Sequence, residues 1–214
     1  MYFDLQSKEM KQEKYLQDIK EIREMMDRSS RFISLSGISG VIAGIIALAS
    51  AFIAYQYIFL ASDYYTLKMV SLTSEGLLDI TILAISTLVL TLGSVVMLTR
   101  RTSKKKGQKL WNKQSQRLII NLAIPLFTGG FVCIILMLNG FIGILAPLTL
   151  IFYGLALINA SNYTLDDIRS LGIAEVILGL TGLYFIEYGL FFWALGFGLL
   201  HIVYGIRMHL KYGS

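Results

Sequence analysis

Residues 32–60 read FISLSGISGVIAGIIALASAFIAYQYIFL, and this stretch contains no charged side chain. About 20 mostly apolar residues are enough for a helix to cross the hydrocarbon core of a bilayer. A helix on the surface of a soluble domain would instead need a polar face toward water. Residues 32–60 therefore predict a transmembrane helix.

Five further apolar stretches follow along the chain, which gives an all-α polytopic membrane bundle of three antiparallel hairpins. The six predicted spans are residues 32–60, 77–98, 118–138, 141–157, 171–186 and 190–206. The composition agrees, because 15% of the 214 residues are charged, against roughly 25% in soluble domains. Around a membrane domain of residues 32–207 we expect a cytoplasmic helix in residues 1–31, a basic loop in residues 99–117 and a tail in residues 208–214.

The distribution of Lys and Arg gives the expected orientation. Cytoplasmic loops of membrane proteins are enriched in these residues. Of the 19 Lys and Arg, every one except Lys68 falls in the N-terminal segment, the 99–117 loop, the connection before residue 171 or the C-terminal end. Six spans place all of these segments on one side, so both termini are expected in the cytoplasm.

The N-terminal segment is expected to form an amphipathic helix. Tyr15, Ile19, Ile22 and Met26 recur at helical intervals between charged residues, which places them on one face of a helix over residues 7–28. The segment lacks the apolar core and cleavage site of a signal peptide. Three uses of the apolar face stay open: docking on the protein's own cytoplasmic side, binding a protein partner or a second copy, and lying on lipid.

The 99–117 loop carries a second concentration of positive charge. An anionic leaflet attracts each such residue by about 1 kcal/mol. We therefore expect contact with anionic lipid headgroups at Arg100, Arg101, Lys104, Lys105, Lys106 and Lys109. The same charges also serve to set topology alone. Because the net charge of +5 arises beside apolar spans, nucleic acid is not an expected partner.

The first and fifth predicted spans begin with similar sequences. Residues 37–45 read GISGVIAGI and residues 172–180 read GIAEVILGL. Small residues at such spacing let two membrane helices approach closely. The small residues expected to pack are Gly37, Gly40, Gly44, Gly172 and Gly179. A late glycine also recurs in the returning helix of each hairpin, at Gly93, Gly154 and Gly205, and these similarities together suggest parallel two-helix repeats.

Glu175 and His201 are ionisable residues expected deep in the membrane. They lie equally far in sequence from the turn around Tyr188, and the constant rise of a helix then puts them at the same depth on neighbouring helices. Such a pair can support a proton relay or hold a substrate, or it can be a polar clamp between two helices. Asn121 and Asn159 are placed similarly about the turn of the second hairpin, and we expect them to clamp that hairpin.

Several chemistries find no support in the sequence. The chain has 2 His and 1 Cys, too few for a His/Cys zinc site within one chain. It contains no phosphate-binding loop, nucleophile elbow, metalloprotease motif or dinucleotide fingerprint. We therefore expect no metal, no cofactor and no enzymatic activity. Two functions stay open: a membrane-anchored interaction or regulatory protein, and a small oligomeric transporter or channel for protons, ions or a small solute that uses Glu175 and His201.

Three short segments carry a family resemblance. They are RFISLSG at residues 31–37, YTLDDIR at residues 163–169 and FWALGFG at residues 192–198. With these segments the chain resembles a family of uncharacterised bacterial membrane proteins with six spans. The resemblance implies a six-span fold in a bacterial inner membrane, and it implies no particular activity.

Overall fold

The structure is a computed structural model, and it describes residues 15–19, 36–56, 74–105, 107 and 111–212. All regular secondary structure in these residues is helical. The helices are α2 (Gly37–Ala54), α3 (Ser74–Lys105), α4 (Lys113–Leu138), α5 (Leu145–Ala160), α6 (Asp167–Tyr184), α7 (Gly189–Trp193) and α8 (His201–Tyr212). A π-helix at Ala194–Leu200 joins α7 to α8, and we call this continuous helix over residues 189–212 the C-terminal rod.

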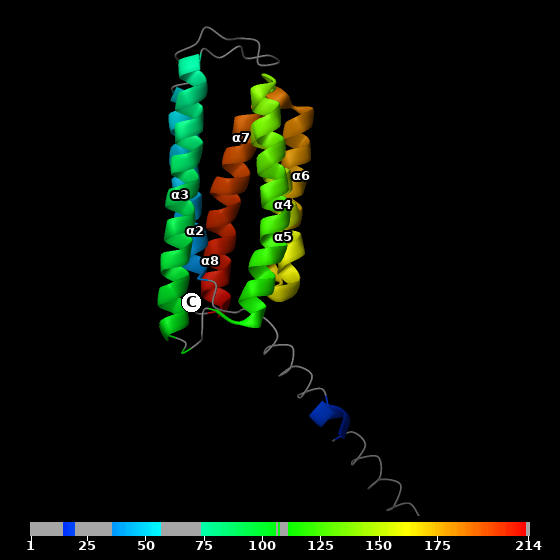
Figure 1. The fold of residues 1–214 in the computed structure, drawn as a ribbon. Helices are drawn as coiled ribbons and strands as arrows, with labels where there is room; N and C mark the ends of the chain where they lie inside the picture. Colours follow the sequence, from blue (N-terminus) through cyan, green and yellow to red (C-terminus); the bar gives the residue numbers. More distant parts are fainter. Residues whose placement is uncertain (1–14, 20–35, 57–73, 106, 108–110, 213–214) are drawn as a thin grey trace, which may run out of the picture.

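The helices stand side by side in one bundle (Figure 1). α2 packs on α3, α4 packs on α5, and α6 packs on the C-terminal rod, so consecutive helices form three hairpins. The hairpins meet where α5 lies along α6 and where α2 lies along α8. The starts of α2, α4 and α6 lie at the same end of the bundle as the final residues of α3, α5 and α8 (Figure 1).

Five helical stretches of the described chain are long and apolar enough to cross a membrane. They are Gly37–Ala54, Leu78–Lys105, Lys113–Leu138, Leu145–Tyr163 and Ile186–Tyr212. The prediction of a multi-pass helical membrane protein is confirmed at this level. α6 differs because its 18 residues include Asp167, Arg169 and Glu175, and each charge weakens the signal of a membrane span. Length and composition therefore do not establish the sixth predicted span.

The predicted boundaries of the 99–117 loop are wrong, because α3 continues past residue 99 and α4 begins before residue 117. Lys and Arg are good helix formers, so basic sequence does not by itself end a helix. The helix ends before Gly107, which adopts a φ of 63° that favours glycine. Asn112 then caps α4, since its side chain accepts the Ser115 N–H at 2.7 Å and the Ser115 hydroxyl oxygen accepts the Asn112 N–H at 2.9 Å.

Only residues 15–19 of the predicted N-terminal helix over residues 7–28 belong to the described part of the chain. They are helical, and the side chains of Tyr15, Leu16 and Ile19 are 62–64% exposed. The rest of that predicted helix lies outside the described residues.

The helices differ in how much of their apolar surface is covered. In the most apolar 18-residue window of each stretch, 39% of the residues are buried inside the bundle in Gly37–Ala54 and in Leu145–Tyr163, compared with 6% in α4 and 0% in α3. α3 and α4 flank the open side of the bundle, where the C-terminal rod is visible between them (Figure 1). Thr81 Oγ1 lies 3.9 Å from Met137 Sδ, but over their described residues the two helices do not pack along their length.

Candidate functional site

The structure brings Glu175 of α6 and His201 of α8 together inside the bundle. His201 Nδ1 lies 3.3 Å from Glu175 Oε1. The Glu175 side chain has no exposed surface, and His201 is 7% exposed. A carboxyl group withdrawn from solvent in this way needs a nearby polar partner, because unpaired charge in an apolar interior is costly. The imidazole ring is that partner.

A glycine makes the space for this carboxyl group. A Cβ built on Gly196 would collide with Glu175 Oε2 and would lie 2.5 Å from Leu150 Cδ2. Gly196 belongs to the π-helix of the C-terminal rod, a wider helical turn that often occurs at functional sites. The π-helix therefore presents backbone, rather than a side chain, to the carboxyl group of α6.

The hydrogen bonds of His201 determine which ring nitrogen carries a proton. Nδ1 lies 3.0 Å from the Gly196 carbonyl oxygen, which can only accept, so Nδ1 is the donor. Nε2 lies 2.8 Å from the hydroxyl of Tyr153. In the neutral ring the Tyr153 hydroxyl therefore donates to Nε2, and in the charged ring Nε2 donates to the Tyr153 oxygen. The ring has a partner in either state.

Tyr153 of α5 is the residue of this cluster that sequence reasoning missed. Its ring centroid lies 4.9 Å from that of Phe197, which in turn lies 5.0 Å from Trp193. The Trp193 indole N–H donates to Thr149 Oγ1 at 3.2 Å. Trp193, Phe197 and His201 are spaced four residues apart. That spacing in the C-terminal rod, with Thr149 and Tyr153 at the same interval in α5, is the signal that could have found the cluster.

The two oxygens of Glu175 are the unusual feature of the cluster. Neither makes a hydrogen bond of standard geometry within the described part of the chain, although His201 Nδ1 is close. A buried polar atom without a hydrogen bond costs about 1–3 kcal/mol. The described residues contain no group of three potential metal ligands.

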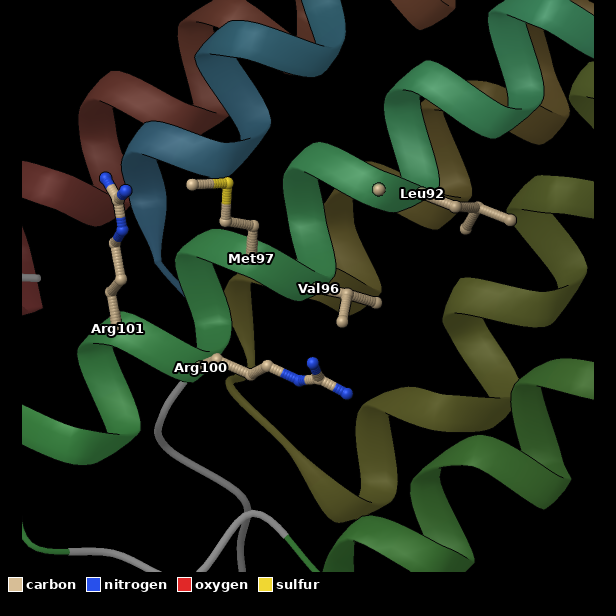
Figure 2. Close-up of a pocket in the computed structure, with 6 residues that line it drawn as sticks. Leu92, Val96, Met97, Arg100 and Arg101 are labelled. Atoms are coloured by element: carbon tan, nitrogen blue, oxygen red, sulfur yellow. The ribbon is translucent and has the colours of Figure 1, made fainter.

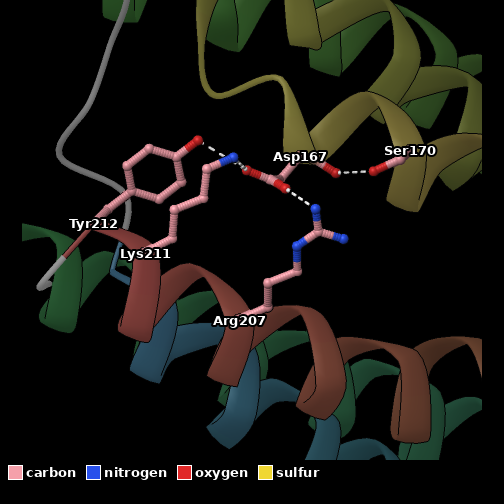
Figure 3. Close-up of polar contacts among 5 residues, drawn as sticks. All are labelled: Asp167, Ser170, Arg207, Lys211 and Tyr212. Atoms are coloured by element: carbon pink, nitrogen blue, oxygen red, sulfur yellow. Dashed lines mark hydrogen bonds and ion pairs between the residues drawn. The ribbon is translucent and has the colours of Figure 1, made fainter.

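Asp167 forms a second polar cluster, at the end of the bundle that holds the C-terminal end of α8 (Figure 3). Its carboxylate accepts hydrogen bonds from Lys211 Nζ at 2.9 Å and the Tyr212 hydroxyl at 2.8 Å. Arg207 Nη2 lies 3.3 Å from the other oxygen, and the Asp167 side chain is 4% exposed. The carboxylate therefore links the start of α6 to the last turns of α8.

The pKa of Asp167 reflects two opposing effects. Burial alone would raise the pKa of this carboxyl group. The hydrogen bonds from Lys211 and Tyr212, together with the positive charges of Lys211 and Arg207, outweigh burial and lower the pKa below its ordinary value. Asp167 therefore stays ionised in the folded protein at neutral pH. Sequence reasoning missed this role because the partners lie far away along the chain.

The remaining predicted residues fall into three places. The five small residues lie at helix contacts: Gly37, Gly40 and Gly44 against α8, and Gly172 and Gly179 against α5. The basic residues Arg100, Arg101, Lys104 and Lys105 are exposed in the last turns of α3, while Lys106 and Lys109 lie outside the described residues. Asn159 Nδ2 donates to the backbone oxygen of Asn121 at 2.9 Å, which joins α5 to α4.

A shallow hollow of about 500 Å³ lies on the surface of α3. Its lining residues are Leu92, Gly93, Val96, Met97, Arg100 and Arg101, all from this one helix. Leu92 and Val96 point to one side of α3 while Met97 and Arg101 point to the other (Figure 2). The hollow is therefore an open surface of α3 and is separate from the Glu175 cluster.

The fold and the cluster of Glu175, His201 and Tyr153 define a multi-pass helical membrane protein with a carboxyl, an imidazole and a phenol side chain together in its interior. Comparison of the chain with protein-family models, curated proteins and solved structures finds no match. The resemblance to a bacterial six-span family stays a prediction from the sequence.

Proposed function

We propose that the protein is a six-span integral membrane protein of the bacterial inner membrane with both termini in the cytoplasm, and that it acts as a membrane-anchored interaction or regulatory protein. The observation that carries the proposal is the basic end of the bundle. Helix ends that are distant in sequence bring exposed cations to one end (Figure 1). These residues are Arg100, Arg101, Lys104, Lys105, Lys113, Arg117, Arg169, Arg207 and Lys211. Such an end fits the cytoplasmic, anionic face of a membrane.

The contacts of α6 support a sixth span. Asp167 and Arg169 lie in its first turn at the basic end, and Glu175 has no exposed surface. None of the three charges in α6 would therefore face lipid in the middle of the bilayer, where a charge is costly. α6 also lies along α5, which belongs to the stretch Leu145–Tyr163 that is long and apolar enough to span.

Cysteine labelling in intact cells tests this topology. In a Cys133→Ser background, Asn162→Cys places a thiol at an exposed position of the turn between α5 and α6. Tyr188→Cys places one at the opposite end, where the native side chain is 60% exposed. A membrane-impermeant maleimide should label position 188 in intact cells and position 162 only after the cells are opened. The reverse pattern would overturn the orientation, and equal labelling of both would overturn the sixth span.

The exposed apolar residues near the N-terminus support a partner. Tyr15, Leu16 and Ile19 are 62–64% exposed, whereas apolar side chains of this size gain about 1.5–3 kcal/mol each when they are buried. We expect a protein partner at the cytoplasmic face to cover them. The membrane-spanning bundle would then hold that partner at the membrane.

Quantitative affinity purification from native membranes tests the partner. The variant Tyr15→Ser/Leu16→Ser/Ile19→Ser should lose the proteins that co-purify with the wild type, while the control Gln17→Ala/Asp18→Ala should keep them. The control changes polar residues of the same short helix. Identical sets of co-purifying proteins in all three samples would rule out an interaction through this segment.

A small transporter or channel for protons, ions or a small solute is the second candidate, and the Glu175 cluster favours it. The imidazole of His201 lies within 3.3 Å of Glu175 and 2.8 Å of the Tyr153 hydroxyl, an arrangement that can pass a proton through the ring. Proteoliposomes with an internal pH dye, placed under a pH gradient, provide the test. Proton entry that is lost in Glu175→Gln would establish this function, and wild-type entry no faster than in empty liposomes would exclude proton transport.

A further inference from the structure

Contacts between neighbouring hairpins follow one pattern, seen first where α2 meets α8. A Cβ built on Gly44 would lie 2.6 Å from the carbonyl oxygen of Gly198 and 2.7 Å from Ile202 Cγ1. From the other side, a Cβ on Gly205 would lie 2.6 Å from the backbone nitrogen of Val41. Each glycine therefore lets the backbone of the opposite helix come close, as in close-packed membrane helices. We call such a contact between helices of adjacent hairpins a seam.

The α5–α6 seam repeats these contacts with different residues. A Cβ on Gly179 would lie 2.8 Å from the carbonyl oxygen of Pro147 and 2.6 Å from Ile151 Cγ1. A Cβ on Gly154 would lie 2.9 Å from the backbone nitrogen of Val176. The two sets of contacts match at the same sequence spacing. Gly198, Ile202 and Gly205 of the C-terminal rod correspond to Pro147, Ile151 and Gly154 of α5, and Val41 and Gly44 of α2 correspond to Val176 and Gly179 of α6. The second and third hairpins therefore meet in the same way as the third and first.

If all three hairpins are related in this way, a third seam is expected between α3 and α4. The residues of α3 that stand around Gly93 as Pro147, Ile151 and Ile158 stand around Gly154 are Ser86, Leu90 and Met97, and all four α3 residues are exposed. A Cβ on Gly93 would meet no atom within 4 Å. Gly93 is one of the residues that line the hollow on α3. In the other two seams the corresponding surface is covered by the next hairpin.

α4 carries the matching face. The spacing of Gly37, Val41 and Gly44 recurs in α4 as Ala123, Phe127 and Gly130. Gly129 packs against Phe152 of α5, and a residue one position further along a helix points about 100° away. Gly130 therefore points to one side of the α5 contact, and a Cβ built there would meet no atom within 4 Å. Met137, two turns along the same face, is the residue that lies against Thr81 of α3.

We propose that α3 and α4 close a third seam, in which the Gly93 face of α3 receives the Ala123–Gly130 face of α4 from the same chain. The described structure is the open state of this lateral gate. Closing it requires α3 to turn about its axis and move toward α4. α3 ends at Lys105 and α4 begins at Lys113, so a short connection joins them. Because a short connection gives a high effective concentration, α3 should meet the α4 of its own chain rather than that of a second copy.

Two departures from the pattern explain why this seam is open while the others are closed. Ala123 stands where α2 has Gly37 and α6 has Gly172. A Cβ on Gly172 would lie 2.7 Å from the Gly154 carbonyl oxygen, so the methyl group of Ala123 holds the helices further apart. Phe127 likewise replaces a valine of the other two seams, and overpacking disfavours a close contact.

Disulfide formation between α3 and α4 tests the gate. Met97 and Ala123 correspond to Ile158 and Gly172, where a built Cβ would lie 2.9 Å from Ile158 Cγ1. Met97→Cys/Ala123→Cys in a Cys133→Ser background should therefore form an intramolecular disulfide in oxidised membranes. Adding Phe127→Val should raise its rate of formation about fivefold, because the substitution relieves overpacking. Intact mass and gel mobility distinguish an intramolecular bond from a dimer.

A matched pair provides the control. Ile124 follows Ala123 by one position, and its counterparts Ile38 and Ile173 are 41% and 45% exposed, away from the closed seams. Met97→Cys/Ile124→Cys should form the bond at least about tenfold more slowly, because a disulfide tolerates only a narrow range of Cα separations. Thermal unfolding of each variant shows that it has folded. Equal rates for both pairs, no bond with or without Phe127→Val, or a disulfide-linked dimer instead would each overturn the proposal.

Discussion

α3 and α6 occupy opposite extremes of the bundle. The most apolar 18-residue window of α3 has a mean hydropathy of 2.3, yet none of its residues is buried. α6 carries three charges but lies against α5 and the C-terminal rod, with six residues buried. Lipid and protein interior are similarly apolar, so hydropathy cannot tell which helix a bundle encloses. The difference lies in small residues that meet a partner backbone: Gly172 and Gly179 meet α5, while Gly93 of α3 meets no atom.

The largest effect is expected from placing the same bulky residue on both helices. Gly172→Leu forces a side chain against the backbone of α5, where even a Cβ would lie 2.7 Å from the Gly154 carbonyl oxygen. We expect a loss of about 3 kcal/mol or more in unfolding free energy. Gly93→Leu should cost almost nothing, since leucine is the better helix former and the site is open. Thermal unfolding in detergent compares the two, and equal losses would contradict the contrast between the helices.

The next effect concerns the interior that α6 helps to cover. His201→Ala removes the hydrogen-bond partner of the Tyr153 hydroxyl and the polar ring that lies 3.3 Å from the buried Glu175 Oε1. The expected cost is about 2–3 kcal/mol in unfolding free energy. A matched histidine replacement, His209→Ala, removes an exposed ring near the end of α8 and should cost less than His201→Ala, because the ring is exposed. If the two substitutions were equally mild, the cluster would not contribute to stability.

Sequence reasoning reached the helices and part of the interior, and its limits have physical causes. Matched distances from a turn suffice to place Glu175 and His201 at one depth, because helix rise is constant. The contacts of Tyr153 and Asp167 could not be predicted, because their partners lie on helices distant in sequence and no local sequence pattern shows how those helices pack. The end of α3 was misplaced because a basic segment can be helical as well as polar. The open side of the bundle depends on Ala123 and Phe127, and apolarity does not distinguish these residues from the glycine and valine of the closed seams.

A smaller and pH-dependent effect is expected where α6 meets α8. Because burial is outweighed by hydrogen bonds and cationic neighbours, the folded-state pKa of Asp167 is lowered. Its ion pairs therefore add stability above the unfolded pKa, and this stability is lost as pH falls through the lowered folded pKa. Asp167→Asn should cost about 1 kcal/mol at neutral pH, since Arg207 and Lys211 are partly exposed and screened.

Unfolding of wild type and Asp167→Asn between pH 7 and pH 2 measures this contribution. The difference in unfolding free energy between the two proteins should be constant from pH 7 to about pH 5. It should shrink below pH 4, where Asp side chains bind protons. A difference that grows toward acid would mean that the carboxyl group is protonated more readily in the folded protein. That result would contradict the ion-paired link between α6 and α8.

The smallest effect is expected on α3 itself. Thr87 Oγ1 lies 2.7 Å from Ser50 Oγ of α2 and 2.7 Å from the carbonyl oxygen of Leu83. One hydroxyl proton cannot serve both oxygens, so whenever Thr87 donates to Leu83, the link between the helices depends on the hydroxyl proton of Ser50. Hydrogen bonds between membrane helices average about 0.6 kcal/mol. Thr87→Val should therefore lower Tm by about 1–2 °C.

Ser86→Ala is the control for this substitution, because Ser86 is exposed and its hydroxyl donates to the Leu83 carbonyl oxygen within its own helix. It should leave Tm unchanged. A Tm loss from Thr87→Val as large as that from His201→Ala would show that α3 is held by this one contact. A loss of 1–2 °C would instead mean that α3 keeps its place through lipid and the broad apolar face of α2. A helix held in that way can move toward α4 without breaking a strong bond, which is the mobility that a third seam requires.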